Sequence, residues 1–210
     1  MCGRYFISEE TEKDIRRIAA RLDLDIDWSA KGDIYPSQKA AVLSAMPGGG
    51  GLYASDMGWG FPMAGNPRAG DQGERKAAGG RLLINARAET ALQKPLFSAS
   101  VLGRRIAIPA AGFYEWDKAG DKVSFFMPEQ ATIYLAGFYQ IFGTDPRFVI
   151  LTRAANECMA PVHDRMPLIL PERELCDWIY EDGKTGEYLR YEGAHLSRKQ
   201  EFRQMSLFDL

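Results

Sequence analysis

The chain has 210 residues, of which 46% are hydrophobic, and its formal net charge is −2. This length and hydrophobic content suit one domain of upper-middle size that buries a substantial core. The charge balance does not mark a nucleic-acid-binding protein, although a local basic patch can bind nucleic acid on a surface that is acidic elsewhere.

The chain begins MCGRYF, which places a cysteine at position 2. If Met1 is removed, Cys2 carries both a thiol and the α-amino group. An α-amino group has a pKa of about 7.7–8.0, against about 10.4 for lysine, so far more of it is neutral and nucleophilic at pH 7. Such an amine can attack an aldehyde, and the thiol can then close a five-membered thiazolidine ring. Alternatively, Met1 stays and Cys2 is a small buried hydrophobic residue.

Two segments predict helices. The stretch SEETEKDIRRIAARLDL predicts a helix over 8–24, with Ser8 as its cap and with Ile15 and Ile18 on a buried face. The stretch PERELCDWIY predicts a second helix over 171–180.

Short apolar runs, mostly broken by Gly or Pro, predict strands over 39–45, 105–110, 112–116, 131–139, 147–152 and 166–170. Many short strands with few helices predict an α+β fold with a bent-sheet or β-barrel-like core of mostly antiparallel strands and flanking helices. The Gly-rich stretch over 62–81 predicts a long loop. We expect a single domain over 1–195, followed by a tail over 196–210.

The chain has three cysteines, Cys2, Cys158 and Cys176, without a CxxC spacing. This odd set argues against a disulfide framework and a zinc site and suits a reducing cytosol. No apolar run resembles a signal peptide or the roughly 20 residues of a membrane helix. We therefore expect a cytoplasmic protein with no metal, no other cofactor and no membrane segment.

Three further segments hold polar residues in apolar settings, namely Asn85 in LLINARAET, Glu115 in PAAGFYEWD and His163 in APVHDRMPLIL. Each has a structural alternative. Asn85 could cap a helix, Glu115 could lie on the wet face of an edge strand, and His163 could be a satisfied core histidine. His195, the other histidine, lies in a polar stretch where a surface position is expected.

The segments MCGRY, INARAET, PAAGFYEW and APVHDRMPLILP resemble the four signature blocks of the SRAP family, the SOS response-associated peptidase proteins. They occur in the family's order across nearly the whole chain. The resemblance implies the SRAP fold and an enzyme of the peptidase or lyase class. It further implies that the protein shields abasic sites in single-stranded DNA through a covalent thiazolidine crosslink, without a cofactor.

By the same resemblance, Cys2 is the nucleophile through both its amine and its thiol. Asn85 holds the cysteine terminus and the sugar, and Glu115 orients and deprotonates the amine. His163 serves as general acid or base in ring opening and in crosslink reversal, which suits a group with a pKa near 6.5. The family also removes its own leading residues, and here only Met1 precedes Cys2.

Further positions match the family's DNA groove. Arg4, Arg87 and Arg165 would contact phosphate oxygens, which guanidinium groups bind well. Trp59 matches an aromatic segment on which a base could stack, with an ordinary core tryptophan as the alternative.

One segment departs from the family's pattern. Many relatives read roughly YNIAPTQ where this chain has GDIYPSQ, so Pro36 fits while Asp33 and Tyr35 differ. This departure therefore affects the DNA-groove contacts that the resemblance implies near Pro36.

The tail segment QMSLF resembles the bacterial sliding-clamp-binding motif. Gln204 would make a polar contact, and Leu207 and Phe208 would enter an apolar groove on the clamp. The alternative is a tail that folds back onto its own domain. We expect a nucleoid-associated monomer whose partners are abasic single-stranded DNA and the clamp.

Three other functions compete with this hypothesis. N-terminal-nucleophile amidotransferases also begin Met-Cys-Gly, but they need a downstream Asn-Gly segment, and no Asn-Gly pair exists here. A processed peptidase acting on other proteins would retain the same nucleophile. A binding module would leave Cys2 purely structural.

Overall fold

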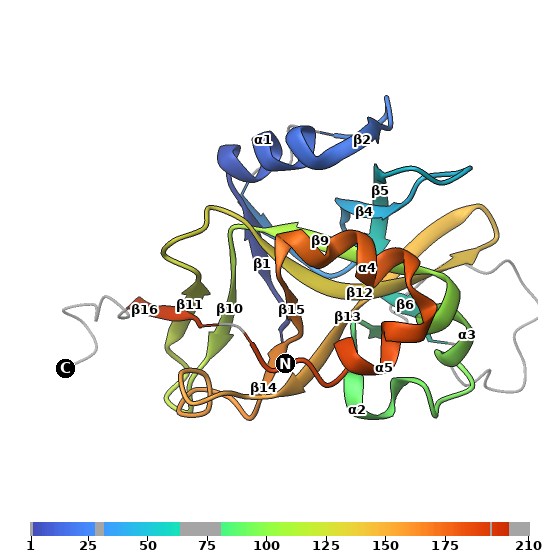
Figure 1. Ribbon diagram of the computed structural model, residues 1–210. Helices are drawn as coiled ribbons and strands as arrows, with labels where there is room; N and C mark the ends of the chain where they lie inside the picture. The colour runs from blue at the N-terminus through green and yellow to red at the C-terminus, as the bar shows by residue number, and fades with distance from the viewer. Residues whose placement is uncertain (1, 28–31, 64–80, 194, 202–210) are drawn as a thin grey trace, which may run out of the picture.

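The computed structural model describes residues 2–27, 32–63, 81–193 and 195–201 (Figure 1). Its strands are β1 (Tyr5–Ile7), β2 (Ala19–Leu22), β3 (Gly32–Ile34), β4 (Lys39–Ala45), β5 (Leu52–Trp59), β6 (Phe61–Pro62), β7 (Leu82–Leu83), β8 (Asn85–Arg87), β9 (Arg105–Ala110), β10 (Gly112–Trp116), β11 (Lys122–Phe126), β12 (Ile133–Phe142), β13 (Asp145–Ala154), β14 (Arg165–Pro167), β15 (Ile169–Leu170) and β16 (Ser197–Glu201). Its α-helices are α1 (Glu9–Ile18), α2 (Ala88–Ala91), α3 (Ser98–Gly103), α4 (Leu175–Tyr180) and α5 (Thr185–Tyr188), and 3-10 turns span Glu172–Glu174 and Asp182–Lys184.

Five strands close into a barrel in the order β13, β12, β9, β4, β5. Neighbouring strands in this order are antiparallel, and the ring closes because β13 also pairs in parallel with the end of β5. Closure leaves no free edge among these strands, which stabilises a sheet of short segments. The predicted α+β fold with a barrel-like core is therefore confirmed.

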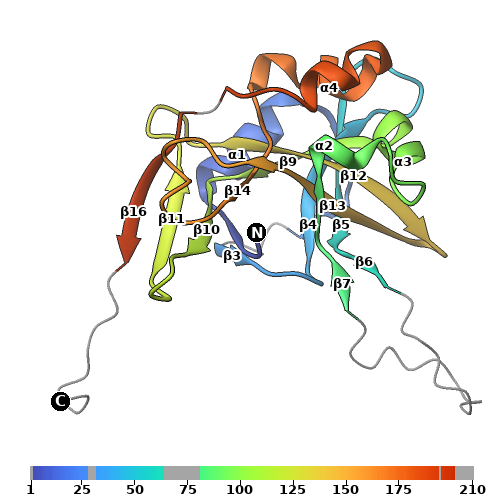
Figure 2. The ribbon, with the colours of Figure 1, turned by 90° about the horizontal axis from the view of Figure 1, so that it is seen from below.

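A second sheet has the strand order β16-β11-β10-β1-β3. Figure 2 shows β16, β11 and β10 forming a wall opposite β4 and β5, with helices α2, α3 and α4 gathered along one side. Strand β1 lies between β10 and β3, which holds the first residues of the chain beside the middle of this sheet. Strand β16 pairs with β11, so residues 197–201, which we assigned to the tail, belong to the sheet.

Buried apolar residues of the described chain form two clusters, to which alternate residues of the barrel strands contribute. One cluster packs under the helices and includes Trp178. The other connects the barrel to the second sheet, and Ile106, Ile150, Phe113 and Cys2 all belong to it. Since side chains of a strand alternate between its faces, the barrel strands supply both clusters. The N-terminal cysteine therefore lies at the junction of the two sheets.

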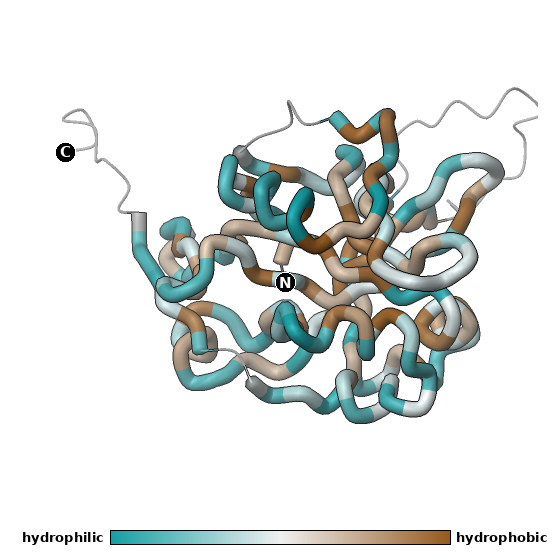
Figure 3. The backbone as a smooth tube through the Cα atoms, turned by 45° about the horizontal axis from the view of Figure 1, so that its top comes forward, coloured by the Kyte–Doolittle hydropathy of each residue, from teal (hydrophilic) through white to brown (hydrophobic). Residues whose placement is uncertain are grey.

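Helix α1 is shorter than the sequence predicts. Ser8 caps it as expected, accepting a hydrogen bond from the backbone of Thr11, and Figure 3 shows a mostly hydrophilic helix with hydrophobic bands. The helix ends at Ile18, however, and Ala19–Leu22 forms β2, which pairs in parallel with β5. The prediction of a helix to residue 24 was wrong because strand pairing outweighs the local helix preference of this segment.

Candidate active site around Cys2

Cys2 is completely buried, with 0% of its surface exposed. Its thiol points at the backbone carbonyl of Arg4, at a sulfur–oxygen distance of 3.7 Å. Burial raises the pKa of the Cys2 thiol far above its ordinary value, and the nearby charge of Glu115 raises it further. In this environment the sulfur stays protonated at neutral pH, so it cannot act first as a thiolate.

Asn85 contacts Cys2 directly. Asn85 is the first residue of β8, which pairs in parallel with the barrel strand β13 and places Asn85 opposite Ile150. Only 8% of the surface of Asn85 is exposed. The Asn85 amide nitrogen donates a hydrogen bond of 2.9 Å to the Cys2 carbonyl. The helix that follows takes Arg87 as its N-cap, so Asn85 is not a helix cap.

Glu115 lies on β10, an interior strand with β1 on one side and β11 on the other. It is 4% exposed, so it does not lie on the wet face of an edge strand. Its charge reaches the Cys2 thiol strongly enough to raise the thiol's pKa. A carboxylate is thus buried close to the cysteine, where a proton acceptor for the α-amine would be needed.

His163 lies in the loop that leads into β14. The amide of Arg165 donates a hydrogen bond of 2.9 Å to Nδ1 of His163, and the Asp164 carboxylate lies 2.9 Å from the same atom. A neutral ring accepts from the amide and carries its proton on Nε2, whereas a protonated ring can donate to Asp164. Both charge states therefore have a partner. Val162 and Met159, from the same loop, pack in the cluster that contains Cys2.

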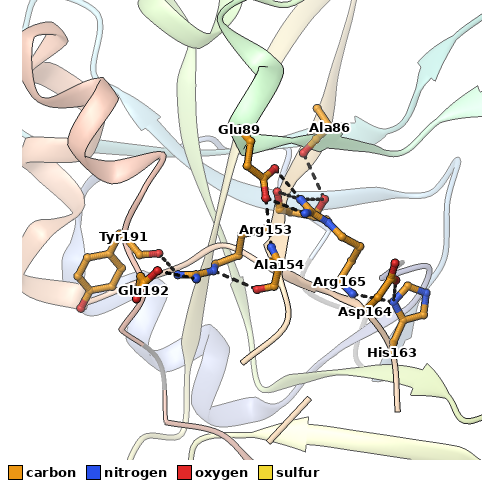
Figure 4. Close-up of polar contacts among 10 residues, drawn as sticks. Ala86, Glu89, Arg153, Ala154, His163, Asp164, Arg165, Tyr191 and Glu192 are labelled. Carbon is orange, nitrogen blue, oxygen red and sulfur yellow. Dashed lines mark hydrogen bonds and ion pairs between the residues drawn. The ribbon is translucent and has the colours of Figure 1, made fainter. Parts of the chain in front are cut away.

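Arg165 forms a two-point ion pair with Glu89 (Figure 4). The nitrogen–oxygen distances are 2.7 and 2.8 Å, and one guanidinium nitrogen also donates to the Thr152 carbonyl at 2.7 Å. Glu89 in turn accepts from the amide of Ala154 at 3.2 Å. The guanidinium holds the pKa of the Glu89 carboxyl below its usual range. This pair joins the segment of Asn85 to the segment of His163, a contact that neither segment reveals by itself.

The other two arginines differ in their surroundings. Arg87, at the end of β8, is exposed, and no hydrogen bond or ion pair of its guanidinium occurs within the described residues. Arg4 lies 3.4 Å from the Asp33 carboxylate and stacks near the rings of Tyr35 and Trp116. Side chains alternate between the two faces of β10, so Trp116 lies on the face opposite the buried Glu115. This alternation could have indicated from the sequence that Trp116 is a site residue.

Trp59 has 0% of its surface exposed. Its ring stacks on Phe148 with a centroid distance of 6.3 Å and tilts against Tyr5, while its indole N–H donates to the Ile84 carbonyl. This geometry favours the core interpretation and leaves no ring face open to a base. Pro36 is partly exposed in the turn after β3.

Several expected features lie elsewhere or outside the described residues. Gln204, Leu207 and Phe208 lie outside them, as do residues 64–80 of the long loop. In the described part of the chain, no helix is long and apolar enough to cross a membrane. The same residues contain no group of three or more side chains arranged to hold a metal ion.

Comparisons with known proteins agree on one family. The family model described as SOS response associated peptidase (SRAP) matches residues 1–206. The abasic site processing protein YoaM of Bacillus subtilis is 29% identical over 90% of this chain and 84% of its own length. The abasic site processing protein YedK of Escherichia coli is 28% identical over 92% of this chain and 87% of its own length.

Solved structures show the same fold. A protein from Bordetella bronchiseptica superposes with a TM-score of 0.73 at 21% identity, covering 96% of this chain and 100% of its own. A protein from Bacteroides thetaiotaomicron gives a TM-score of 0.72 at 16% identity, covering 97% of this chain and 93% of its own.

Proposed function

Because the chain belongs to the SRAP family, whose matched relatives include abasic site processing proteins, we propose that it captures abasic sites in single-stranded DNA. Capture is covalent and uses Cys2 after Met1 has been removed. The product is a thiazolidine that joins the cysteine to the aldehyde of the ring-opened sugar. The protein is thus an enzyme of DNA damage processing that acts once on each lesion and shields it.

One observation supports this proposal most strongly, namely the hydrogen bond of 2.9 Å from Asn85 to the Cys2 carbonyl. Cys2 precedes strand β1, and its carbonyl takes this hydrogen bond from a side chain rather than from a backbone amide of the sheet. Here a buried amide from a distant strand fixes the backbone orientation of Cys2. The α-amine and the thiol of that residue are therefore held in a defined direction before an aldehyde arrives.

The first chemical step belongs to the amine. The neutral α-amine attacks the aldehyde carbon, water leaves, and a carbon–nitrogen double bond replaces the carbon–oxygen bond. Glu115 takes the proton that the ammonium form must lose, because it is a buried carboxylate near Cys2. An α-amine needs little help at neutral pH, since its ordinary pKa is about 7.7–8.0.

The second step belongs to the thiol. Sulfur adds to the same carbon, so that a carbon–sulfur bond forms and the thiol proton ends on the imine nitrogen. No oxidant or reductant is consumed. The raised pKa of the Cys2 thiol keeps the sulfur protonated and unreactive until an imine lies beside it. This order prevents the buried thiol from being consumed by other electrophiles.

His163 supplies the proton transfers on the sugar. Opening the sugar ring requires a proton to move between the hydroxyl and the ring oxygen, and reversal requires the same transfer backwards. Nδ1 of His163 has a backbone donor for the neutral ring and a carboxylate for the charged ring. Both states are therefore accommodated, as a general acid and base requires.

The DNA strand would follow the arginines around this site. Arg87 is the exposed candidate for a phosphate contact, and Arg4, 25% exposed, is a second candidate whose backbone carbonyl accepts from the Cys2 thiol. Arg165 would contact phosphate only in addition to its ion pair with Glu89. We further propose that Gln204, Leu207 and Phe208 bind the bacterial sliding clamp, which would bring a nucleoid-associated monomer to single-stranded lesions.

A denaturing gel tests the crosslink. The protein, with Met1 removal verified by mass, is incubated with single-stranded DNA that carries one abasic site. A heat-stable shifted band is expected for the wild type and for Cys158→Ala, and it should be absent for Cys2→Ala. A correctly trimmed wild type that gives no band would overturn the proposal.

A further inference from the structure

The guanidinium of Arg4 is enclosed by three side chains. Its Nη1 lies 3.4 Å from the Asp33 carboxylate, and its central carbon lies 4.4 Å from the Tyr35 ring centroid and 5.0 Å from the Trp116 ring centroid. Asp33 lies on β3, Tyr35 follows that strand, and Trp116 ends β10. Side chains from both sides of β1 therefore converge on the guanidinium of Arg4, whose backbone carbonyl accepts from the Cys2 thiol.

The local backbone fixes this arrangement. Strand β3 pairs with β1 so that Asp33 lies opposite Phe6, and the next turn is held by the Gln38 side chain, which accepts from the Tyr35 amide at 2.7 Å. The Tyr35 hydroxyl also donates to the Asp33 carboxylate at 3.4 Å. Asp33 thus stays near Arg4 through strand pairing and through a second contact.

The contact between Asp33 and Arg4 is long for an ion pair. Charge-assisted hydrogen bonds between nitrogen and oxygen are usually about 2.7–2.9 Å, whereas this one is 3.4 Å. The side chains are 25% and 29% exposed, so both remain within reach of solvent and of an incoming phosphate. The attraction is mainly long-range, and the guanidinium keeps capacity for a better acceptor.

Asp33 also borders an acidic hollow. Asp23, Asp25, Asp27 and Asp56 line the same pocket as Asp33. A phosphate that approaches Arg4 therefore meets the field of several carboxylates, of which Asp33 is the one in contact with the arginine.

We propose that Asp33 competes with DNA phosphate for Arg4 and so sets the strength of reversible DNA binding at this site. This inference rests on the proposed function, because it assumes that Arg4 faces a DNA strand. Asp33 lowers the affinity for undamaged single strands, which offer no aldehyde. Selectivity for abasic over undamaged DNA then comes from the covalent step at Cys2 rather than from reversible binding.

Fluorescence anisotropy with an undamaged single-stranded oligonucleotide tests this inference, because undamaged DNA cannot crosslink. Asp33→Asn should tighten binding about fivefold at low salt by removing one competing charge. It should also steepen the plot of log association constant against log salt by about 0.7, the value for one added phosphate contact on a single strand. Asp25→Asn is the matched control, since it removes an equal charge from the same pocket without touching Arg4.

A double variant shows whether Asp33 acts through Arg4. In an Arg4→Ala background, Asp33→Asn should change affinity no more than Asp25→Asn does. If Asp33→Asn lowers the melting temperature, Asp33→Ser is used instead, because it removes the same charge.

Equal effects of Asp33→Asn and Asp25→Asn in the native background would overturn the inference. If the wild type crosslinks abasic DNA while these two variants behave alike, only this inference fails. If Asp33→Asn alone tightens binding but no crosslink forms, the proposed covalent function fails instead.

Discussion

Glu89 and Arg165 form a two-point ion pair, with nitrogen–oxygen distances of 2.7 and 2.8 Å, between two segments that are far apart in the sequence. Glu89 follows Asn85 on the same segment, and the amide of Arg165 donates to His163. The pair therefore links the segment that carries Asn85 to the segment that carries His163.

Removing the charge of Glu89 should slow crosslinking more than it lowers stability. Glu89 is 47% exposed, so Glu89→Gln should cost at most about 1 kcal/mol of unfolding free energy. Arg165, whose backbone amide donates to His163, would lose its charged partner, and the optimum of the crosslinking pH–rate profile should move. Single-turnover kinetics across pH measures this shift.

Glu172→Gln provides the matched control, because Glu172 forms a similar two-point pair with Arg17. That variant should leave the pH–rate profile unchanged. A profile that responds equally to both substitutions would show that Glu89 contributes only general stability.

Replacing Asn85 should impair both stability and reaction. Asn85→Ala leaves the buried Cys2 carbonyl without its donor, which should cost about 1–3 kcal/mol. Asn85→Asp should react more slowly still, because it turns a carboxylate oxygen toward that carbonyl. Crosslinking rates measured at saturating DNA, together with urea unfolding, check both effects. Unchanged crosslinking by Asn85→Ala would remove the observation on which the proposed function depends most.

The two histidines should behave differently. His163→Ala should slow crosslink formation or reversal while leaving binding of undamaged single strands mostly intact, because its role is proton transfer. His195→Ala is the natural comparison and should change neither. Loss of DNA binding in His163→Ala would assign His163 to structure or to DNA contact rather than to proton transfer.

The buried thiol should make stability depend on pH in alkaline solution. The pKa of Cys2 is raised in the folded state above its ordinary value of 9.0. Above that pH the unfolded chain loses the proton while the folded chain keeps it. The contribution is therefore fully present below pH 9 and falls by about 1.4 kcal/mol per pH unit above it.

Urea unfolding between pH 8 and 10 measures this loss, and Cys2→Ala should flatten the decline. Cys176→Ala should not, because Cys176 is exposed. An identical pH dependence in the wild type and in Cys2→Ala would mean that the thiol is not held protonated.

Local patterns were sufficient for the parts of the fold that depend on local chemistry. The run KAAVLSA is β4 from Lys39 to Ala45, and RIAIPA is β9 from Arg105 to Ala110, because continuous apolar runs fit strands buried on both faces. Ser8 caps α1 because its side chain competes for the first helical amides. The strand β2 could not be found in this way, since its pairing with β5 outweighs a helical pattern.

Local sequence patterns likewise predicted candidate site residues but not the contacts between distant residues. Asn85, Glu115 and His163 were candidates because polar residues in apolar settings need a reason, and the structure brings Asn85 into contact with Cys2. The partners of the arginines were not predictable. Glu89 and Arg165 are separated by 76 residues, and Asp33 reaches Arg4 only because β3 pairs with β1. Such contacts depend on topology, which a motif does not encode.

Peptide mass spectrometry of the crosslinked product tests the central claim most directly. After protease and nuclease digestion, the peptide that carries the sugar remnant is treated with a thiol-alkylating reagent. The account predicts that this peptide begins at Cys2, lacks Met1 and takes up no alkyl group, because both its amine and its sulfur are bonded to the sugar. A remnant attached to lysine, a retained Met1, or an alkylated Cys2 in the crosslinked peptide would contradict it.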